Sequence, residues 1–330
     1  MPLPTNLEGR LSLPLIGAPL FIVSNPDLVI EQCKAGVMGA FPALNARPPE
    51  MLDQWIGRIK SELGAWAKAH PGAPVAPFAV NQIVHHSNER LEHDVDVCVK
   101  HEVPFIISSL QAPTAIEKQI HSYGGRIFHD VTNIRHAKKA LDEGADGLIL
   151  VCAGAGGHAG TLSPFALVAE VRQFFDGPVI LSGAMATGSQ ILAAQAMGAD
   201  LAYFGTRFIA SKEANAPDRY KQMVVESRAS DIVYTSLFSG VKGNYLSASI
   251  AEAGLDPANL PEADKSKMDF RSGGSVDRRT WRDIWSAGQS SGVIRDVPST
   301  AEIVDRLRTE YEAAKNVLRT QSKPFLASAA

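Results

Sequence analysis

Short apolar runs alternate with helix-like segments from residue 15 to residue 204, and this alternation constrains the fold more than any other feature of the chain. Short strands that are apolar throughout are typical of strands buried on both faces. Regular alternation of strands with helices implies that the strands are parallel. We therefore predict an α/β fold, a (β/α)8 TIM barrel. The expected strands are 15–18, 37–41, 74–80, 105–108, 126–131, 147–151, 179–182 and 201–204.

An open, doubly wound sheet is the competing fold. That fold places a G-x-G-x-x-G turn directly after its first strand. Here the first strand leaves through Gly17-Ala-Pro-Leu-Phe21, which does not supply those glycines. Eight β–α units over about 200 residues match the size of a barrel, so we favour the barrel.

The β–α pattern stops after Phe204, and the remaining chain is predicted to form two further parts. We expect the barrel to occupy residues 1–211 and a smaller inserted C-terminal cap region to occupy residues 212–280. Residues 281–330 are expected to form a C-terminal segment that returns to the barrel.

Helical spacing is clearest at the end of the chain. A final helix is predicted from residue 300 to about residue 319, with Ile303, Leu307 and Tyr311 on its buried stripe. Further helices are expected at residues 48–70, 114–123 and 245–253.

Charge and cysteine usage exclude several classes of protein. A net charge of −3 gives no electrostatic reason to expect binding to nucleic acid or to an anionic membrane. No apolar run approaches the length of a membrane span, and we see no signal peptide. Three unclustered cysteines, Cys33, Cys98 and Cys152, fit a reducing cytoplasm and give no metal-ligand spacing, so we expect a cytoplasmic protein without a metal.

A glycine-rich loop with one histidine follows the sixth expected strand. It runs Ala153-Gly-Ala-Gly-Gly-His-Ala-Gly160 and places His158 among four glycines, whose backbones can turn where a Cβ would forbid it. Barrel enzymes place their chemistry at such strand ends. The alternative is a turn whose histidine simply faces water, and the loop alone does not decide between the two.

Two further turns, after the seventh and eighth expected strands, contain glycine and enter helices. They are Ser182-Gly-Ala-Met-Ala-Thr-Gly188 and Gly205-Thr206. Barrels commonly bind phosphate at this position, where backbone amides and helix starts meet the anion. Either turn alone would be interpreted as a tight turn between a strand and a helix. The presence of such turns after both the seventh and the eighth strand favours a phosphate-bearing cofactor.

These motifs, taken in order, resemble the nitronate monooxygenase family, formerly called 2-nitropropane dioxygenases. The resemblance runs from about residue 14 to residue 292 and includes Gly17-Ala-Pro-Leu20, the glycine-rich loop, Phe204-Gly-Thr-Arg-Phe208 and Trp285-Ser-Ala-Gly-Gln-Ser-Ser-Gly292. Members are FMN-dependent (β/α)8 enzymes. Related members on the same barrel include NADH:quinone reductases and enoyl-thioester reductases.

The resemblance implies a set of roles at the site. The first turn would lie against the isoalloxazine ring, Asn81 would hydrogen-bond the flavin, and the turns after the seventh and eighth strands would hold the phosphate. The C-terminal segment would close over the cofactor, and His158 would face the substrate as the catalytic residue. The residues expected at FMN are Ala18, Pro19, Leu20, Asn81, Ala153, Gly154, Ser182, Gly183, Ala184, Gly205, Thr206, Gly288 and Gln289.

The reaction implied by the resemblance is FMN-dependent oxidation of alkyl nitronates by O2 to a carbonyl compound and nitrite. A protonated or hydrogen-bonding His158 could stabilise the anionic nitronate. A neutral His158 could instead remove the α-proton of a neutral nitroalkane. The expected partners are the nitronate and O2, while use of NAD(P)H and assembly into a homodimer stay open.

Three other functions compete with this one. The first is an NAD(P)H:quinone or enoyl-type flavin reductase on the same scaffold, and the second is a flavin-binding protein without catalysis. The third is a barrel enzyme that acts on a phosphorylated substrate without flavin, for which Asp130 is the candidate strand-end group.

Two departures from the family pattern affect these roles. Ser182 stands where the family usually has glycine, and its amide can still bind phosphate. Asp130 stands where some members carry a lysine near the flavin, so no role is carried over to it. His129 is left open between a flavin contact and a structural hydrogen bond, whereas Arg207 is expected to pair locally and Cys152 to be a small buried group.

Overall fold

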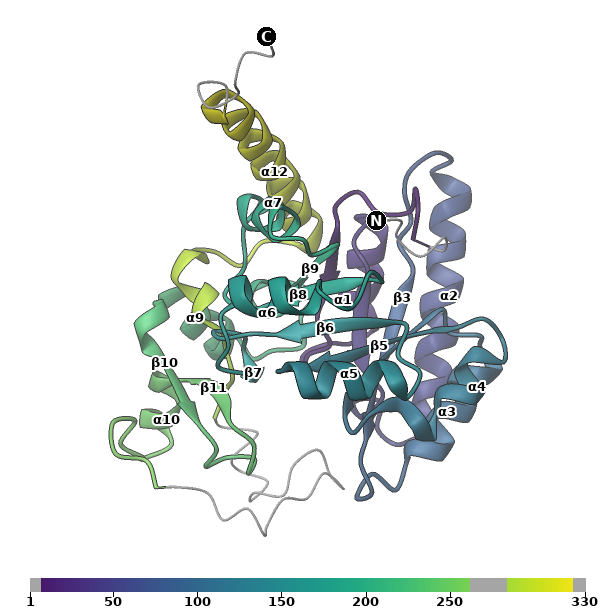
Figure 1. The fold of residues 1–330 in the computed structure, drawn as a ribbon, viewed down its shortest axis with the longest axis horizontal. Helices are drawn as coiled ribbons and strands as arrows, with labels where there is room; N and C mark the ends of the chain where they lie inside the picture. Colours follow the sequence, from purple (N-terminus) through teal and green to yellow (C-terminus); the bar gives the residue numbers. More distant parts are fainter. Residues whose placement is uncertain (1–6, 262–283, 323–330) are drawn as a thin grey trace.

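The computed structural model describes residues 7–261 and 284–322, and its centre is an eight-stranded parallel sheet (Figure 1). Neighbouring strands follow the order β1-β9-β8-β6-β5-β4-β3-β2. A parallel bridge between Ile16 and Met38 joins the two ends and nearly closes the sheet into a barrel. The prediction of a TIM-barrel-like α/β fold is therefore confirmed. The strands are β1 (Leu15–Gly17), β2 (Gly39–Pro42), β3 (Phe78–Val84), β4 (Phe105–Leu110), β5 (Arg126–Val131), β6 (Gly147–Val151), β8 (Val179–Ser182) and β9 (Leu201–Phe204).

The inside of the barrel is filled by alternate residues of the strands. These side chains form one buried cluster, in which the rings of Phe105 and Phe128 lie 5.2 Å apart. Their neighbours in sequence point outward to the helices, which explains why each strand is apolar on both faces. The inward cluster includes Ile16, Met38, Ala79, Ile107, Ile149, Ile180, Leu201 and Tyr203.

Helices cover the outside of the sheet, and their starts follow local sequence rules. Asn25 caps α1 by accepting a hydrogen bond from the Leu28 amide at 2.9 Å, as its position before Pro26 predicts. Thr187 and Gln190 form a capping box at α7. The helices are α1 (Pro26–Lys34), α2 (Met51–Ala69), α3 (Leu91–Lys100), α4 (Glu117–His121), α5 (Ile134–Asp142), α6 (Pro164–Val171), α7 (Gly188–Ala196), α8 (Thr206–Ile209), α9 (Asp218–Glu226), α10 (Ser247–Glu252) and α12 (Thr300–Ser322).

Two segments of the barrel differ from the sequence prediction. The third strand begins at Phe78 rather than at residue 74, because Pro74 and Pro77 lack the amides that a sheet ladder needs, and it continues to Val84. Asn81 consequently lies in the middle of β3 rather than at its end. The helix expected at residues 114–123 is reduced to a 3-10 turn followed by α4.

A small antiparallel sheet lies beside the barrel, at the lower left of Figure 1. It consists of β10 (Ile232–Thr235), β11 (Gly243–Leu246) and β7 (Gly157–His158). The helix expected at residues 245–253 is wrong in its first turn, because Tyr245 and Leu246 pair with β10 and the helix α10 begins at Ser247. The glycine-rich loop thus supplies the strand that joins this sheet to the barrel.

The last helix packs its first half onto the barrel and then projects from it (Figure 1). Ile303 and Leu307 are buried, and Glu310 accepts a hydrogen bond from the Gly188 amide at 2.8 Å. A Cβ on Gly188 would lie 2.1 Å from the Leu307 carbonyl oxygen, so glycine permits the close contact between α7 and α12. None of the described helices combines the length and apolar character needed to cross a bilayer.

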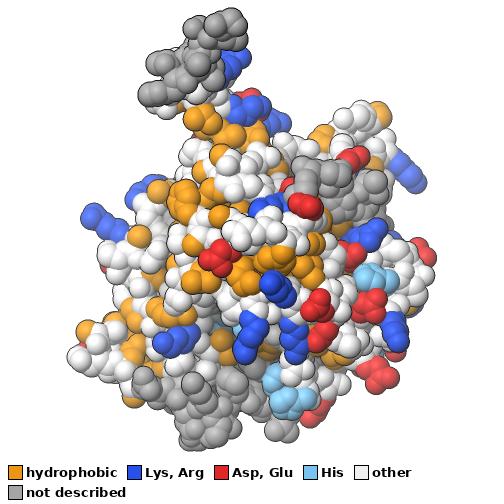
Figure 2. Space-filling view, viewed as in Figure 1, with side chains coloured by type: hydrophobic (Ala, Val, Ile, Leu, Met, Phe, Trp, Pro, Cys, Tyr) orange, Lys and Arg blue, Asp and Glu red, His pale blue; other side chains and the backbone are white. Residues whose placement is uncertain are grey.

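Acidic and basic side chains are interspersed on the face shown in Figure 2 rather than gathered by sign.

Candidate active site

Gly154 holds two sequence-distant segments together at the carboxyl ends of the strands. Its carbonyl oxygen accepts hydrogen bonds from the Gln289 amide at 2.9 Å and the Ala184 amide at 3.3 Å. Its φ of 81° lies in the left-handed region that favours glycine. A Cβ on Gly154 would lie 3.0 Å from the Ala184 Cβ, so the glycine also permits the close approach.

Thr206 and Gly288 make a second connection across the same site. The Thr206 hydroxyl accepts a hydrogen bond from the Gly288 amide at 2.9 Å. A Cβ on Gly288 would lie 2.6 Å from the Gly154 carbonyl oxygen and 2.8 Å from the Gly156 nitrogen. The loop after β6, the start of α8 and the C-terminal segment therefore meet at backbone distance.

The turn after β1 contacts the segment that leads into α8. The Ala18 amide donates to the Phe204 carbonyl oxygen at 2.9 Å. A Cβ on Gly205 would lie 3.2 Å from Leu20 Cδ2 and 3.6 Å from the Ala18 Cβ. Gly205 thus faces the turn that contains Pro19, and the absence of a side chain leaves room between the two loops.

The turn after β8 carries an unusual backbone. Gly183 has a φ of 139° and Ala184 a φ of 54°, and the second value is uncommon for a residue with a Cβ. A Cβ on Gly183 would lie 2.9 Å from the Ala153 carbonyl oxygen. Ser182 is buried and accepts the Cys152 amide at 3.0 Å through its carbonyl oxygen. This turn therefore packs directly on the glycine-rich loop.

Polar side chains form the floor of the barrel mouth. Asn81 Nδ2 donates to the Ser109 hydroxyl at 2.8 Å, and that hydroxyl donates to Asp130 Oδ2 at 2.6 Å. Side chains two residues apart on a strand point to the same face of the sheet. The three polar residues follow inward-pointing members of the buried cluster by two positions, so they also point into the barrel; those members are Ala79, Ile107 and Phe128. Burial raises the pKa of Asp130 to about 6. Sequence reasoning assigned Asn81 to the flavin and named Asp130 only as the strand-end group of a barrel enzyme without flavin. The alternation of side chains along β4 and β5 was the signal that could have placed Ser109 and Asp130 beside Asn81.

The side chain of His129 points outward from the barrel rather than into its mouth. It neighbours the inward Phe128 and pairs in register with Ser108, whose hydroxyl is 2.8 Å from His129 Nδ1. Burial lowers the pKa of His129 to about 4, and the charges of His136 and Glu143 reach it from the α5 side. Of the two roles left open for His129, the structure supports the structural hydrogen bond.

His158 is fixed at the junction between the barrel and the small sheet. Its backbone pairs with Gly243, and its Nε2 lies 2.9 Å from the Ser239 hydroxyl. That hydroxyl gives its single proton to the Val241 carbonyl oxygen at 2.9 Å, so we infer that His158 Nε2 carries the proton and donates to Ser239. Although the residue keeps some exposed surface, burial of its ring lowers the pKa to about 4. The imidazole is therefore neutral at pH 7.

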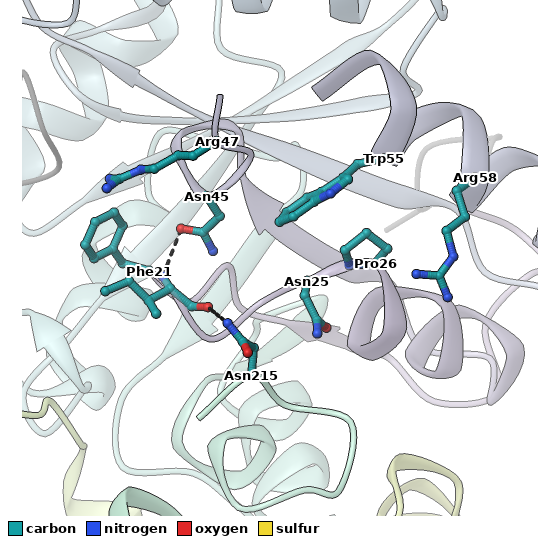
Figure 3. Close-up of a pocket in the computed structure, with 9 residues that line it drawn as sticks. Phe21, Asn25, Pro26, Asn45, Arg47, Trp55, Arg58 and Asn215 are labelled. Carbon is teal, nitrogen blue, oxygen red and sulfur yellow. Dashed lines mark hydrogen bonds between the residues drawn. The ribbon is translucent and has the colours of Figure 1, made fainter. Parts of the chain in front are cut away.

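A cavity of about 470 Å³ borders the turn after β1 (Figure 3). Asn45 spans this turn: its Oδ1 accepts the Ile22 amide at 2.9 Å, and its Nδ2 donates to the carbonyl oxygens of Leu20 and Ser24 at 2.9 and 2.8 Å. Asn215 Nδ2 donates to the Ile22 carbonyl oxygen at 3.0 Å. Ile22 itself has a φ of 67°, a strained value for a β-branched residue. Sequence reasoning missed Asn45, because nothing near it in the sequence marks the turn that it supports.

The remaining residues have structural roles. Arg207 donates to the carbonyl oxygen of Ala210, three residues away, which confirms local pairing, and also to that of the sequence-distant Asp296. Cys152 is fully buried, as expected. Within residues 7–261 and 284–322, no three His, Cys, Asp or Glu side chains are grouped so that they could hold a metal.

Comparison with curated proteins gives two full-length relatives. The nitronate monooxygenase of Paraburkholderia phytofirmans is 24% identical, and the alignment covers 93% of this chain and 94% of the relative. The nitronate monooxygenase of Neurospora crassa is 26% identical, with 90% and 88% covered.

Solved structures share the fold over nearly the whole chain. FabK from Thermotoga maritima superposes with a TM-score of 0.75 at 23% identity, covering 96% of this chain and 98% of that one. A nitroalkane oxidase from Streptomyces ansochromogenes superposes with a TM-score of 0.76 at 22% identity, covering 95% and 100%. The family model for nitronate monooxygenase matches residues 11–310. This chain therefore belongs to the nitronate monooxygenase family.

Proposed function

We propose that this protein binds FMN and oxidises an alkyl nitronate with O2 to a carbonyl compound and nitrite. The single observation that carries the proposal is the meeting of the loop after β6, the turn after β8, the start of α8 and the C-terminal segment around Gly154 and Gly288. The chain also belongs to the flavin-oxidoreductase family that contains the two nitronate monooxygenase relatives. Those loops hold most of the residues that the family resemblance assigns to the cofactor.

The residues present fit a flavin phosphate and ring. Gly183 and Gly205 have no side chain where the loops approach one another, and the first amides of α8 lack intrahelical acceptors. Asp130 Oδ1 is buried without a hydrogen-bond partner among the described residues, so the barrel floor has a polar group for a bound ligand to satisfy. Ser182 to Ala184 with Gly205 and Thr206 would hold the phosphate. Ala18 to Leu20 would lie against the ring, and Gly288 and Gln289 would cover it.

When bound, the flavin supplies the electron chemistry with nitronate and O2. The protein would position the substrate beside the flavin and accept its proton. His158 is neutral at pH 7, and its Nε2 donates to Ser239. A neutral imidazole is a suitable general base near neutral pH. It could therefore remove the α-proton of a neutral nitroalkane. A nitronate has already lost that proton and would need only binding.

The test is nitronate-dependent oxygen consumption by the purified protein loaded with FMN, with nitrite measured in parallel. The proposal expects nitrite to form with ethylnitronate or propionate-3-nitronate and no added NADH. NADH oxidation with a quinone or an enoyl thioester, without nitrite from either nitronate, would instead place the protein among the flavin reductases. Heat-denatured protein with the same FMN is the control for oxidation by free flavin.

A further inference from the structure

The two carboxyl oxygens of Asp130 differ in their hydrogen bonding. It follows Phe128 by two residues on β5, and Phe128 belongs to the inner cluster, so the side chain faces the barrel axis. Oδ2 accepts the Ser109 hydroxyl at 2.6 Å, whereas Oδ1 is buried and has no partner among the described residues. A buried carboxyl oxygen without a partner is costly, unless a proton or a ligand satisfies it.

The hydrogen-bond chain determines where a proton on this carboxyl would sit. Asn81 Nδ2 donates to the Ser109 hydroxyl, which therefore uses its own single proton to donate to Asp130 Oδ2. Asn81 Nδ2 also donates to the Ile107 carbonyl oxygen at 3.0 Å, which fixes the amide orientation. Since Oδ2 already accepts a hydrogen bond from Ser109, a neutral Asp130 carries its hydrogen on Oδ1, the oxygen without a partner among the described residues.

The surroundings favour this neutral form. Burial is the largest influence and raises the pKa of Asp130 to about 6, against the lowering effect of the Ser109 hydrogen bond. The titratable group that faces it is Tyr203 on β9, whose pKa is raised well above its ordinary value by burial and by the Asp130 charge, so the phenol stays neutral. In the described part of the chain, no lysine, arginine or histidine forms an ion pair with Asp130.

We propose that Asp130 binds the flavin as a neutral carboxylic acid, with Oδ1–H donating a hydrogen bond to an acceptor atom of the isoalloxazine ring. The ring offers carbonyl oxygens and unprotonated nitrogens as acceptors, and a carboxylate would repel them. Binding to the ionised protein therefore takes up one proton. This inference rests on the proposed function, because it requires a flavin in the barrel mouth.

The proposal predicts pH-dependent affinity. Where free Asp130 is ionised, each unit of rising pH should weaken flavin binding by up to about tenfold. The phosphate of FMN itself titrates near pH 6. Riboflavin, which has no phosphate, is therefore the primary probe, and FMN is measured beside it.

The experiment is a fluorescence-quenching titration of the full-length apoprotein with riboflavin between pH 5 and pH 8. For the wild type, the Kd should be nearly constant at the acid end and rise steadily above about pH 6. Asp130→Asn keeps a donor group of similar size that cannot ionise, so its Kd should be low and independent of pH. A flat wild-type profile, a Kd that falls as pH rises, or an unchanged slope in D130N would overturn the proposal.

Ser109→Ala provides a second variant in case D130N does not fold. It keeps the carboxyl and removes the hydrogen bond that lowers the pKa of Asp130, so the rise in Kd should begin at a higher pH. An unshifted profile in folded S109A, checked by circular dichroism, contradicts the proposal. Failure of the wild type to bind either flavin at any pH overturns the proposed function as well, whereas pH-independent binding overturns this inference alone.

Discussion

The Gln289 amide donates a hydrogen bond to the Gly154 carbonyl oxygen at 2.9 Å, and this contact joins the C-terminal segment to the loop after β6. Gly288, one residue earlier, lies against the backbone of the same loop. Residues far apart in the sequence thus meet at the carboxyl ends of the strands. The chain beyond the barrel therefore helps to shape the place where the cofactor is proposed to bind.

Gly288→Ala should loosen this contact. The new Cβ would lie 2.6 Å from the Gly154 carbonyl oxygen, a backbone atom that cannot rotate away. We expect a loss of about 1–3 kcal/mol in unfolding free energy and at least tenfold weaker FMN binding, measured by urea denaturation and fluorescence titration. Gly64→Ala on α2 is the control, because its Cβ meets nothing within 4 Å and a helical alanine should stabilise. Equal effects of the two substitutions would contradict the assignment.

Asn45→Ala should release the turn after β1. It removes three hydrogen bonds that hold the backbone of residues 20–24 around the strained Ile22. We expect a loss of about 2–4 kcal/mol in unfolding free energy. Asn215→Ala removes one side-chain hydrogen bond to the same turn and should cost only about 1 kcal/mol. Thermal unfolding that ranks the two variants the other way would contradict this account.

His129 should make the protein less stable in acid. Its pKa is lowered from 6.5 to about 4 in the folded chain, so the unfolded chain binds more protons between those values. Stability should therefore fall as pH drops from about 6.5 to 4, by up to about 3 kcal/mol from this residue. His129→Asn should flatten that part of the profile. Urea denaturation at stepped pH measures both slopes.

His158→Gln should lower the turnover of a neutral nitroalkane more than the turnover of its nitronate. A glutamine cannot act as a base, so kcat/KM for a neutral nitroalkane should fall by about 10²–10⁴-fold. The nitronate needs no proton removal, and its kcat/KM should fall by less than about tenfold on the same reasoning. Ser239→Ala, which removes the partner of Nε2, should lower nitroalkane turnover less than the histidine variant does. An equal fall in kcat/KM with both substrates would contradict a general-base role for His158.

The barrel could be predicted from sequence because each strand is short, apolar and separated from the next by a helical pattern. The errors in β3 and β11 arose where apolar runs contain proline or border a helix. Pro77 delays the start of β3, and the residues of β11 become a strand only because β10 and β7 lie on either side. Such pairing between distant segments leaves no periodic signal in a short run.

The candidate site was predicted in part. Glycine-containing loops marked the segments that meet at Gly154, because a close backbone approach requires glycine there. The floor formed by Ser109 and Asp130 depends on which strand face points inward, and that face follows from register rather than from residue type. Asn45 acts on a turn distant in sequence, so its role required the three-dimensional structure.

The most direct test of the central claim is an anaerobic absorbance titration of the FMN-loaded protein, with ethylnitronate and NADH added in separate experiments. Ethylnitronate should change the flavin bands, NADH should change them little, and nitrite should appear when air is admitted to the nitronate sample. Full bleaching by NADH with no response to nitronate would contradict the proposed reaction. Failure to bind FMN at all would contradict the proposed site.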